Sequence, residues 1–189
     1  AILFALFVGI PLGILAAVFK DQFLDKFLSF FSVLGMSLPS FFSSVLMAYF
    51  FAYKFGEITH LNITGSLFVV DDLGVGERLC VKNLILPALT LGIRPLAVIV
   101  HLTRASFIDE LQADYILLAK SKGLTLTYII FAHALRNSMS SIVTAASGWF
   151  AGMLSGAVFV EYIFGWNGLG KLLVDALISV DFPVVMGVI

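Results

Sequence analysis

The chain alternates long apolar runs with short polar stretches, and this pattern defines its predicted elements. No charged side chain occurs in residues 1–19, 27–53 or 137–160, and residues 84–103 carry one, Arg94. At about 1.5 Å per residue, helices of these lengths cover most or all of a bilayer core of about 30 Å. The pattern therefore predicts membrane-spanning helices at 1–19, 27–53, 84–103, 137–160 and 172–189.

Proline, glycine and charge set the boundaries between these runs. We expect a kink near Pro39, a loop at 54–83 with a short β-like piece at Ser66–Val70, and a glycine-rich turn at 161–171. The segment 172–189 is expected to begin a further helix. Because both ends of the chain lie inside apolar runs, the sequence predicts a fragment of a longer polytopic chain.

Residues 104–136 form a polar, basic block between the third and fourth predicted spans. Within it, Leu111, Tyr115 and Leu118 recur at the spacing of one helix face. Two lysines precede Gly123, where they favour the negative end of a helix dipole, and glycine suits the left-handed turn after a helix. The pattern predicts an amphipathic helix at 111–122. On these residues alone, a surface helix at the level of the lipid headgroups explains it equally well.

The distribution of basic residues predicts the orientation. Six lysines and arginines fall in the links 20–26 and 104–136, which lie on the same side of the predicted topology: Lys20, Lys26, Arg104, Lys120, Lys122 and Arg136. Four fall in the opposite loops: Lys54, Arg78, Lys82 and Lys171. The excess assigns 20–26 and 104–136 to the cytoplasm.

The composition agrees with a membrane protein and excludes other classes. Hydrophobic residues make up 60% of the chain and charged residues 12%, whereas soluble domains carry about a quarter charged residues. A net charge of −1 argues against a nucleic-acid partner. The lone Cys80 and the spacing of His60, His101 and His133 predict no metal site, and no cofactor is expected. Because no phosphate-binding glycine loop is present, any ATP would have to be hydrolysed by a partner.

Two features inside the predicted spans have open interpretations. Gly148, Gly152 and Gly156 form two overlapping G-x-x-x-G motifs, which let helix backbones approach closely in lipid. They fit either contact with a second subunit or packing within this one. Arg94 fits either a solute pathway or a side chain that reaches the membrane interface, and Glu161 an interfacial anchor or turn residue.

The polar block also carries a family resemblance. Ala119, Gly123 four residues later, and the run His133-Ala-Leu-Arg-Asn resemble the cytoplasmic loop signature of ABC-importer permeases, in the variant of the oligopeptide, dipeptide and nickel importers. The chain departs from the wider pattern at four positions: Leu117, Leu118, His133 and Arg136. Further segments fit the same branch in order: Ile10–Gly13, Ser37–Ser40, Leu86–Thr90, Arg104–Ser106, Val160–Glu161, Phe164, Trp166, Gly168–Gly170 and Asp181–Pro183. Asn167 replaces the proline usual before Gly-Leu-Gly.

The resemblance implies an all-α polytopic transmembrane bundle, residues 1–189 being one permease domain with a cytoplasmic coupling helix. It implies a non-catalytic subunit of an ATP-binding-cassette importer in the bacterial inner membrane, moving peptides or a related solute such as nickel. The implied partners are ATP-binding subunits, a second homologous permease, an external solute-binding protein and membrane lipid. The residues expected at the ATPase are Leu111, Asp114, Tyr115, Leu118, Ala119, Lys120, Lys122, Gly123 and Arg136.

Three alternatives belong to other classes. A secondary transporter or channel would need membrane-embedded carboxylates or broken helices that coordinate ions, and the uncharged runs hold no acidic residue. An intramembrane enzyme would need paired acid, histidine or nucleophile groups at membrane depth. A structural scaffold would leave the basic block unexplained.

Overall fold

The computed structural model describes residues 1–70, 77–154 and 157–189. These residues are predominantly helical, with a single two-stranded hairpin, so the predicted all-α class is confirmed. The chain divides into two compact units. Unit 1 contains Ala1, Leu38–Gly92 and Ala151–Ile189, and unit 2 contains Ile2–Ser37 and Ile93–Phe150.

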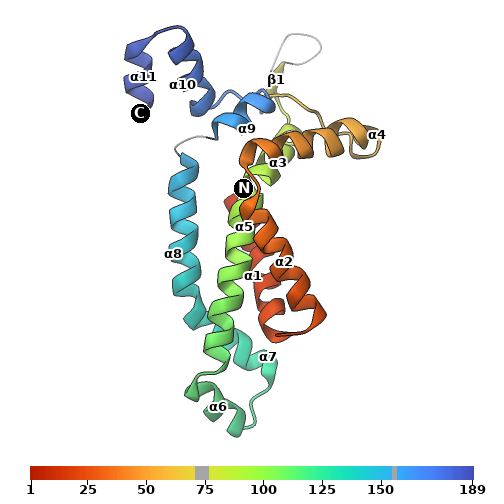
Figure 1. Cartoon of the computed structure of the whole chain (residues 1–189), viewed down its shortest axis with the longest axis vertical. Helices are drawn as coiled ribbons and strands as arrows, with labels where there is room; N and C mark the ends of the chain where they lie inside the picture. The colour runs from red at the N-terminus through yellow and green to blue at the C-terminus, as the bar shows by residue number, and fades with distance from the viewer. Residues whose placement is uncertain (71–76, 155–156) are drawn as a thin grey trace. The chain divides into compact units, whose positions relative to one another are not determined.

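Unit 2 is built from long helices followed by short ones (Figure 1). Its elements are α1 (Ile2–Val18), α2 (Phe23–Ser37), the later part of α5 (Lys82–Leu111), α6 (Asp114–Ser121), α7 (Leu126–Tyr128), the π-helix η2 (Ile129–Ala134) and most of α8 (Leu135–Leu154). Because α7, η2 and α8 follow one another without a gap, the chain is continuously helical from Leu126 to Leu154. The short α6 is thus the one separate helix between two long ones in the part of unit 2 that the structure describes.

A stripe of small residues packs α1 against α5. Ala5, Gly9, Gly13 and Ala17 recur every fourth residue on α1 and are all buried. A Cβ atom added at Gly13 would lie 2.8 Å from the Val100 carbonyl oxygen, so the two backbones approach closely there. Such approach is the usual role of small residues between membrane helices. The sequence analysis did not single out this stripe, although its spacing is readable from the sequence.

Unit 1 combines the first part of α5 with several shorter elements. These are α3 (Ser40–Met47), the π-helix η1 (Ala48–Lys54), α4 (Gly56–Thr59), β1 (Phe68–Val70), β2 (Glu77–Leu79), α9 (Val158–Ile163), α10 (Leu169–Ile178) and α11 (Phe182–Val188). The strands pair antiparallel, with Phe68 opposite Leu79. Ala48, Leu86, Val160 and Phe164 form the buried core of the unit.

The structure sharpens three predicted boundaries. The kink expected near Pro39 is a break, since one helix ends at Ser37 and the next begins at Ser40. The predicted β-like piece contains β1. The third predicted span does not end at residue 103, because α5 continues to Leu111.

The two predictions for the last 30 residues were incomplete. The stretch 161–171 is not all turn, because Glu161 lies in α9 and α10 begins at Leu169. The segment 172–189 holds parts of two helices rather than one. Val180 adopts a positive φ of 58°, and the Asp181 side chain accepts a hydrogen bond from the Val184 N–H at 3.3 Å, which caps α11.

Five membrane-spanning segments were predicted, but fewer of the described helices are long and apolar enough to cross a membrane. Among the described residues, α5 meets this requirement alone, and a second span is counted if the bent pair Phe23–Ser37 and Ser40–Lys54 is taken together. The apolar α1 has 17 residues.

Candidate functional site

The helix α6 has sharply defined ends. Before it, the Gln112 and Ala113 amides donate to the carbonyls of Asp109 and Glu110, which closes the end of α5. After it, Gly123 has a φ of +78°, as predicted for a residue that turns the chain left-handed. The Gly123 amide donates to the Lys120 carbonyl at 2.9 Å. The Leu124 amide donates to the Ala119 carbonyl. These two hydrogen bonds form the Schellman arrangement, which satisfies carbonyls at a helix end.

The inner face of α6 is formed by residues other than the apolar set Leu111, Tyr115 and Leu118, whose spacing the sequence shows. Ile116 and Ala119 are buried and pack with Ile129 of η2. Leu117 and Leu118 point outward instead, with 56% and 58% of their surface exposed. Leu111, predicted as the start of this helix, is the last residue of α5 and packs against the same cluster.

Tyr115 ties α6 to both long helices. Its hydroxyl donates to the Glu110 carboxylate at the end of α5 and accepts from the Asn137 amide of α8 at 2.9 Å. The Asn137 amide also reaches Glu110, at 3.4 Å. Burial raises the pKa of the Tyr115 phenol above its ordinary value, and the bond to Glu110 acts in the same direction, so the hydroxyl remains a donor at neutral pH. The sequence analysis named Tyr115 but missed Glu110.

The charged residues predicted for this region lie around α6 without forming one cluster. Asp114 opens its first turn, where a carboxylate favours the helix dipole. Lys120 and Lys122 are exposed on its last turn and at its C-cap. Arg136 is exposed in the first turn of α8 rather than in a loop. The outer surface of α6 is therefore apolar at two leucines and basic at two lysines.

The predicted glycine stripe lies on an open face of α8. A Cβ atom added at Gly148 or Gly152 would meet no atom of the described residues within 4 Å. Gly156 lies outside the described residues. The alternative that these glycines pack within this chain therefore gains no support from the described residues, in contrast to the buried stripe on α1.

Arg94 has an aromatic partner on α8. Its guanidinium lies over the Trp149 ring, 5.8 Å from the ring centroid. Cation–π contact of this kind offsets part of the cost of placing a cation beside an apolar helix. The residue itself is exposed.

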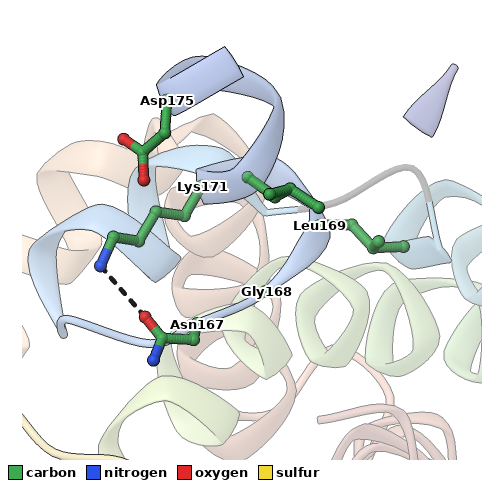
Figure 2. Close-up of a pocket in the computed structure, with 6 residues that line it drawn as sticks. Asn167, Gly168, Leu169, Lys171 and Asp175 are labelled. Carbon is green, nitrogen blue, oxygen red and sulfur yellow. Dashed lines mark hydrogen bonds between the residues drawn. The ribbon is translucent and has the colours of Figure 1, made fainter. Parts of the chain in front are cut away.

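A cavity of about 430 Å³ opens at the start of α10, lined by Asn167, Gly168, Leu169, Lys171, Leu172 and Asp175 (Figure 2). The Lys171 ammonium donates to the Asn167 side-chain oxygen at 3.1 Å, along one edge of the cavity. Glu161 supports this corner, because its carboxylate accepts from the Lys171 backbone N–H at 2.8 Å. Glu161, which lies in α9, thus holds the start of α10 across the intervening turn.

In the described ranges, no three histidine, cysteine or acidic side chains are close enough together to hold a metal ion. A predominantly helical chain with 60% hydrophobic residues fits the class of helical membrane proteins.

Comparison with known proteins identifies the family. Residues 9–189 match the family described as "Binding-protein-dependent transport system inner membrane component". The chain belongs to this family, which confirms the resemblance seen in the sequence.

Curated relatives carry peptide-transport names. The chain is 38% identical to the dipeptide transport system permease protein of Haemophilus influenzae and 37% identical to that of Escherichia coli, covering 99% of this chain and 60% of each relative. It is 34% identical to the glutathione transport system permease protein of Escherichia coli, covering 98% of this chain and 56% of the relative. The chain thus spans about 60% of the length of the two dipeptide permease proteins.

Proposed function

We propose that this chain is part of a permease subunit of an ATP-binding-cassette importer for peptides, driven through α6 by separate ATP-binding subunits. Membership of the family and the names of its relatives support the importer and favour peptides over nickel. The observation that carries the driving role is the attachment of α6. It is short, capped at Gly123 and fixed to α5 and α8, while its outer face is free.

The outer face of α6 has the chemistry of a docking surface. Leu117 and Leu118 offer apolar side chains for a cleft on the ATPase, and Lys120 and Lys122 offer charges for acidic partners or anionic lipid. Ile116 and Ala119 hold the helix to η2 from the other side. A force applied at the outer face is therefore transmitted to the flanking long helices instead of bending a loose loop.

The resemblance to ABC-importer permeases implies the mechanism, and the attachment of α6 to its neighbours supports it. When two ATPase subunits close on ATP, each docked α6 is displaced, and the energy of closure biases the membrane helices between inward-open and outward-open arrangements. The solute reaches the permease pair from an external solute-binding protein. A second, homologous permease forms the other half of the pathway, and the open glycine face of α8 is its proposed contact.

The placement of both basic links on one side has support from unit 2. Asp25, which belongs to the link 20–26 and lies in the first turn of α2, forms an ion pair with Arg104, the first residue of the link 104–136. Both links therefore lie at the same end of the unit, as they must if both face the cytoplasm.

Cysteine crosslinking in the assembled full-length complex tests the docking role. Cysteines at Leu118 and Ser121 face outward and should crosslink to an ATPase subunit, whereas a cysteine at the buried Ala119 should not. Normal transport by a complex in which neither outward cysteine reaches the ATPase would refute docking. Labelling of Ser121→Cys from the external side alone would refute the topology. Uptake of a dipeptide, compared with nickel uptake, tests the substrate.

A further inference from the structure

Asp25 and Arg104 form an ion pair between two helices, in which the carboxylate is buried and the guanidinium is partly exposed. Asp25 lies in the first turn of α2 and only 2% of its side chain is exposed. Arg104 lies on α5, and its Nε and Nη2 atoms donate to different oxygens of the same carboxylate, the second at 2.7 Å. Such a two-pronged pair fixes both distance and orientation.

The Asp25 carboxylate also accepts two further hydrogen bonds. It accepts from the Asp21 backbone N–H at 2.8 Å and from the Ser29 hydroxyl at 3.3 Å. Asp21 itself has a φ of 66°, so the link between α1 and α2 is folded back onto the carboxylate. Asp25 therefore organises its own link and joins that link to α5.

Stability alone is a poor explanation for this arrangement. The free-energy cost of removing two charges from water offsets most of the attraction between them. Replacing such a pair by apolar side chains of similar size is therefore often neutral or stabilising for the fold. What apolar side chains do not supply is a fixed geometry between two helices. The pair is therefore best understood through the relative position that it imposes.

Two other attachments follow Arg104 along α5. One turn later, the fully buried Phe107 packs with Ala17 of α1 and with Ala134 of η2. Further along, Glu110 holds Tyr115 of α6. The last turns of α5 thus contact the α1–α2 link on one side and the α6 region on the other.

We propose that Asp25 and Arg104 are positioning residues that make the α1–α2 link move with α5 as one body when α6 is displaced. This inference rests on the proposed function, because it requires α6 to be driven by an ATPase. Neither residue contacts the ATPase or the solute in this role. When both side chains are replaced, the α1–α2 link no longer follows α5 as α6 is displaced, while α6 itself stays docked on the ATPase.

A double variant separates positioning from stability. Removing one partner would leave a buried charge, so Asp25→Leu is combined with Arg104→Met to remove both. In the full-length complex we expect normal assembly, normal crosslinking of Leu118→Cys to the ATPase, and about tenfold less solute moved per ATP hydrolysed, within the usual range of coupling between sites. Parent-like transport per ATP would overturn the inference and leave the proposed function standing.

Two further measurements keep the inference testable if the double variant does not assemble. Arg104→Lys retains the charge but loses the two-pronged geometry, so it should also lower transport per ATP. A parent-like ratio for Arg104→Lys would again overturn the inference.

Spin labels at the exposed Leu24 and Ala105 in the otherwise unchanged complex show directly whether the α1–α2 link and α5 move together. Their separation should stay constant between nucleotide-free and ATP-bound states, and a change between the states would overturn the inference. If a transporting parent complex shows no crosslink from Leu118→Cys, the proposed docking fails instead, whatever the labels report.

Discussion

The Leu124 amide donates a hydrogen bond to the Ala119 carbonyl oxygen, 3.3 Å away, across the left-handed residue Gly123. This bond spans the end of α6 and fixes the direction in which the chain leaves it. It forms only while the intervening residue keeps a positive φ. The identity of residue 123 therefore controls the shape of the proposed docking helix.

Substitutions at Gly123 should act through the backbone and not through crowding. No described atom lies within 4 Å of a Cβ at this position, so the cost is that of a positive φ, about 1–2 kcal/mol for alanine. Asparagine should cost less and valine more. Solute-stimulated ATP hydrolysis and hydrogen exchange of α6 should follow that order. Gly56→Ala, at an equally open site without a positive φ, is the control. Equal effects of all three substitutions would contradict the explanation.

Tyr115→Phe should loosen α6 without displacing its apolar core. The change removes the hydroxyl that joins Glu110 to Asn137, which typically costs about 0.5–1.5 kcal/mol. Hydrogen exchange of α6 amides should become faster by a factor of about 2–10, the ratio that corresponds to that energy. Tyr128→Phe is the matched control, because the ring of Tyr128 contacts His133 and its hydroxyl joins no such network among the described residues. Unchanged exchange in Tyr115→Phe would show that the network does not hold the helix.

The two stripes of small residues should respond differently to enlargement. A methyl group at Gly13 would meet the Val100 carbonyl at 2.8 Å, so Gly13→Ala should destabilise the full-length protein by about 1–3 kcal/mol. Gly152→Ile enters open space and should leave thermal unfolding of the isolated subunit unchanged. It should instead weaken association with the second permease, measured by co-purification. Normal assembly of Gly152→Ile would remove the α8 face from that interface.

The sequence predicted the features that depend on local chemistry. The glycine turn at 123, a change of helix direction near Pro39 and the separate helix before Gly123 all follow from the conformations that those residues favour. The sequence did not indicate which face of α6 packs inward, because an apolar chain carries leucine or isoleucine on more than one helix face. The spacing of apolar residues along the sequence singles out Tyr115 and Leu118, whereas the residues of α6 that are buried are Ile116 and Ala119.

Contacts between distant residues lay beyond the sequence pattern. Asp25 and Arg104 are 79 positions apart, and nothing in their local spacing connects them. Small residues indicate that two helix backbones can approach closely, but not which helix they meet. The glycine motif on α8 was therefore predicted as a packing surface, whereas the small residues of α1, which the structure buries against α5, were not. The extension of α5 to Leu111 was missed because charge in residues 104–111 resembles a loop, although such residues are good helix formers.

The corner formed by Glu161 and Gly168 should behave as one unit. The Glu161 carboxylate accepts from the Lys171 amide at the start of α10 and occupies the space where a side chain at position 168 would stand. Glu161→Ala should cost about 1 kcal/mol, because it removes a charged acceptor from a helix N-terminus. Gly168→Ala alone should cost a similar amount, since its methyl group would displace that carboxylate and so break the same bond.

A double-mutant cycle on this corner gives the sharpest test. Once Glu161 is alanine, Gly168→Ala has nothing to displace, so the double variant should lose far less stability than the two single variants together. The protection of α10 amides against hydrogen exchange measures each variant. Additive losses would mean that Gly168 is required for its backbone alone and that the carboxylate does not hold the start of α10. Gly187→Ala, at a site with no described atom within 4 Å, should leave the protection of α10 unchanged.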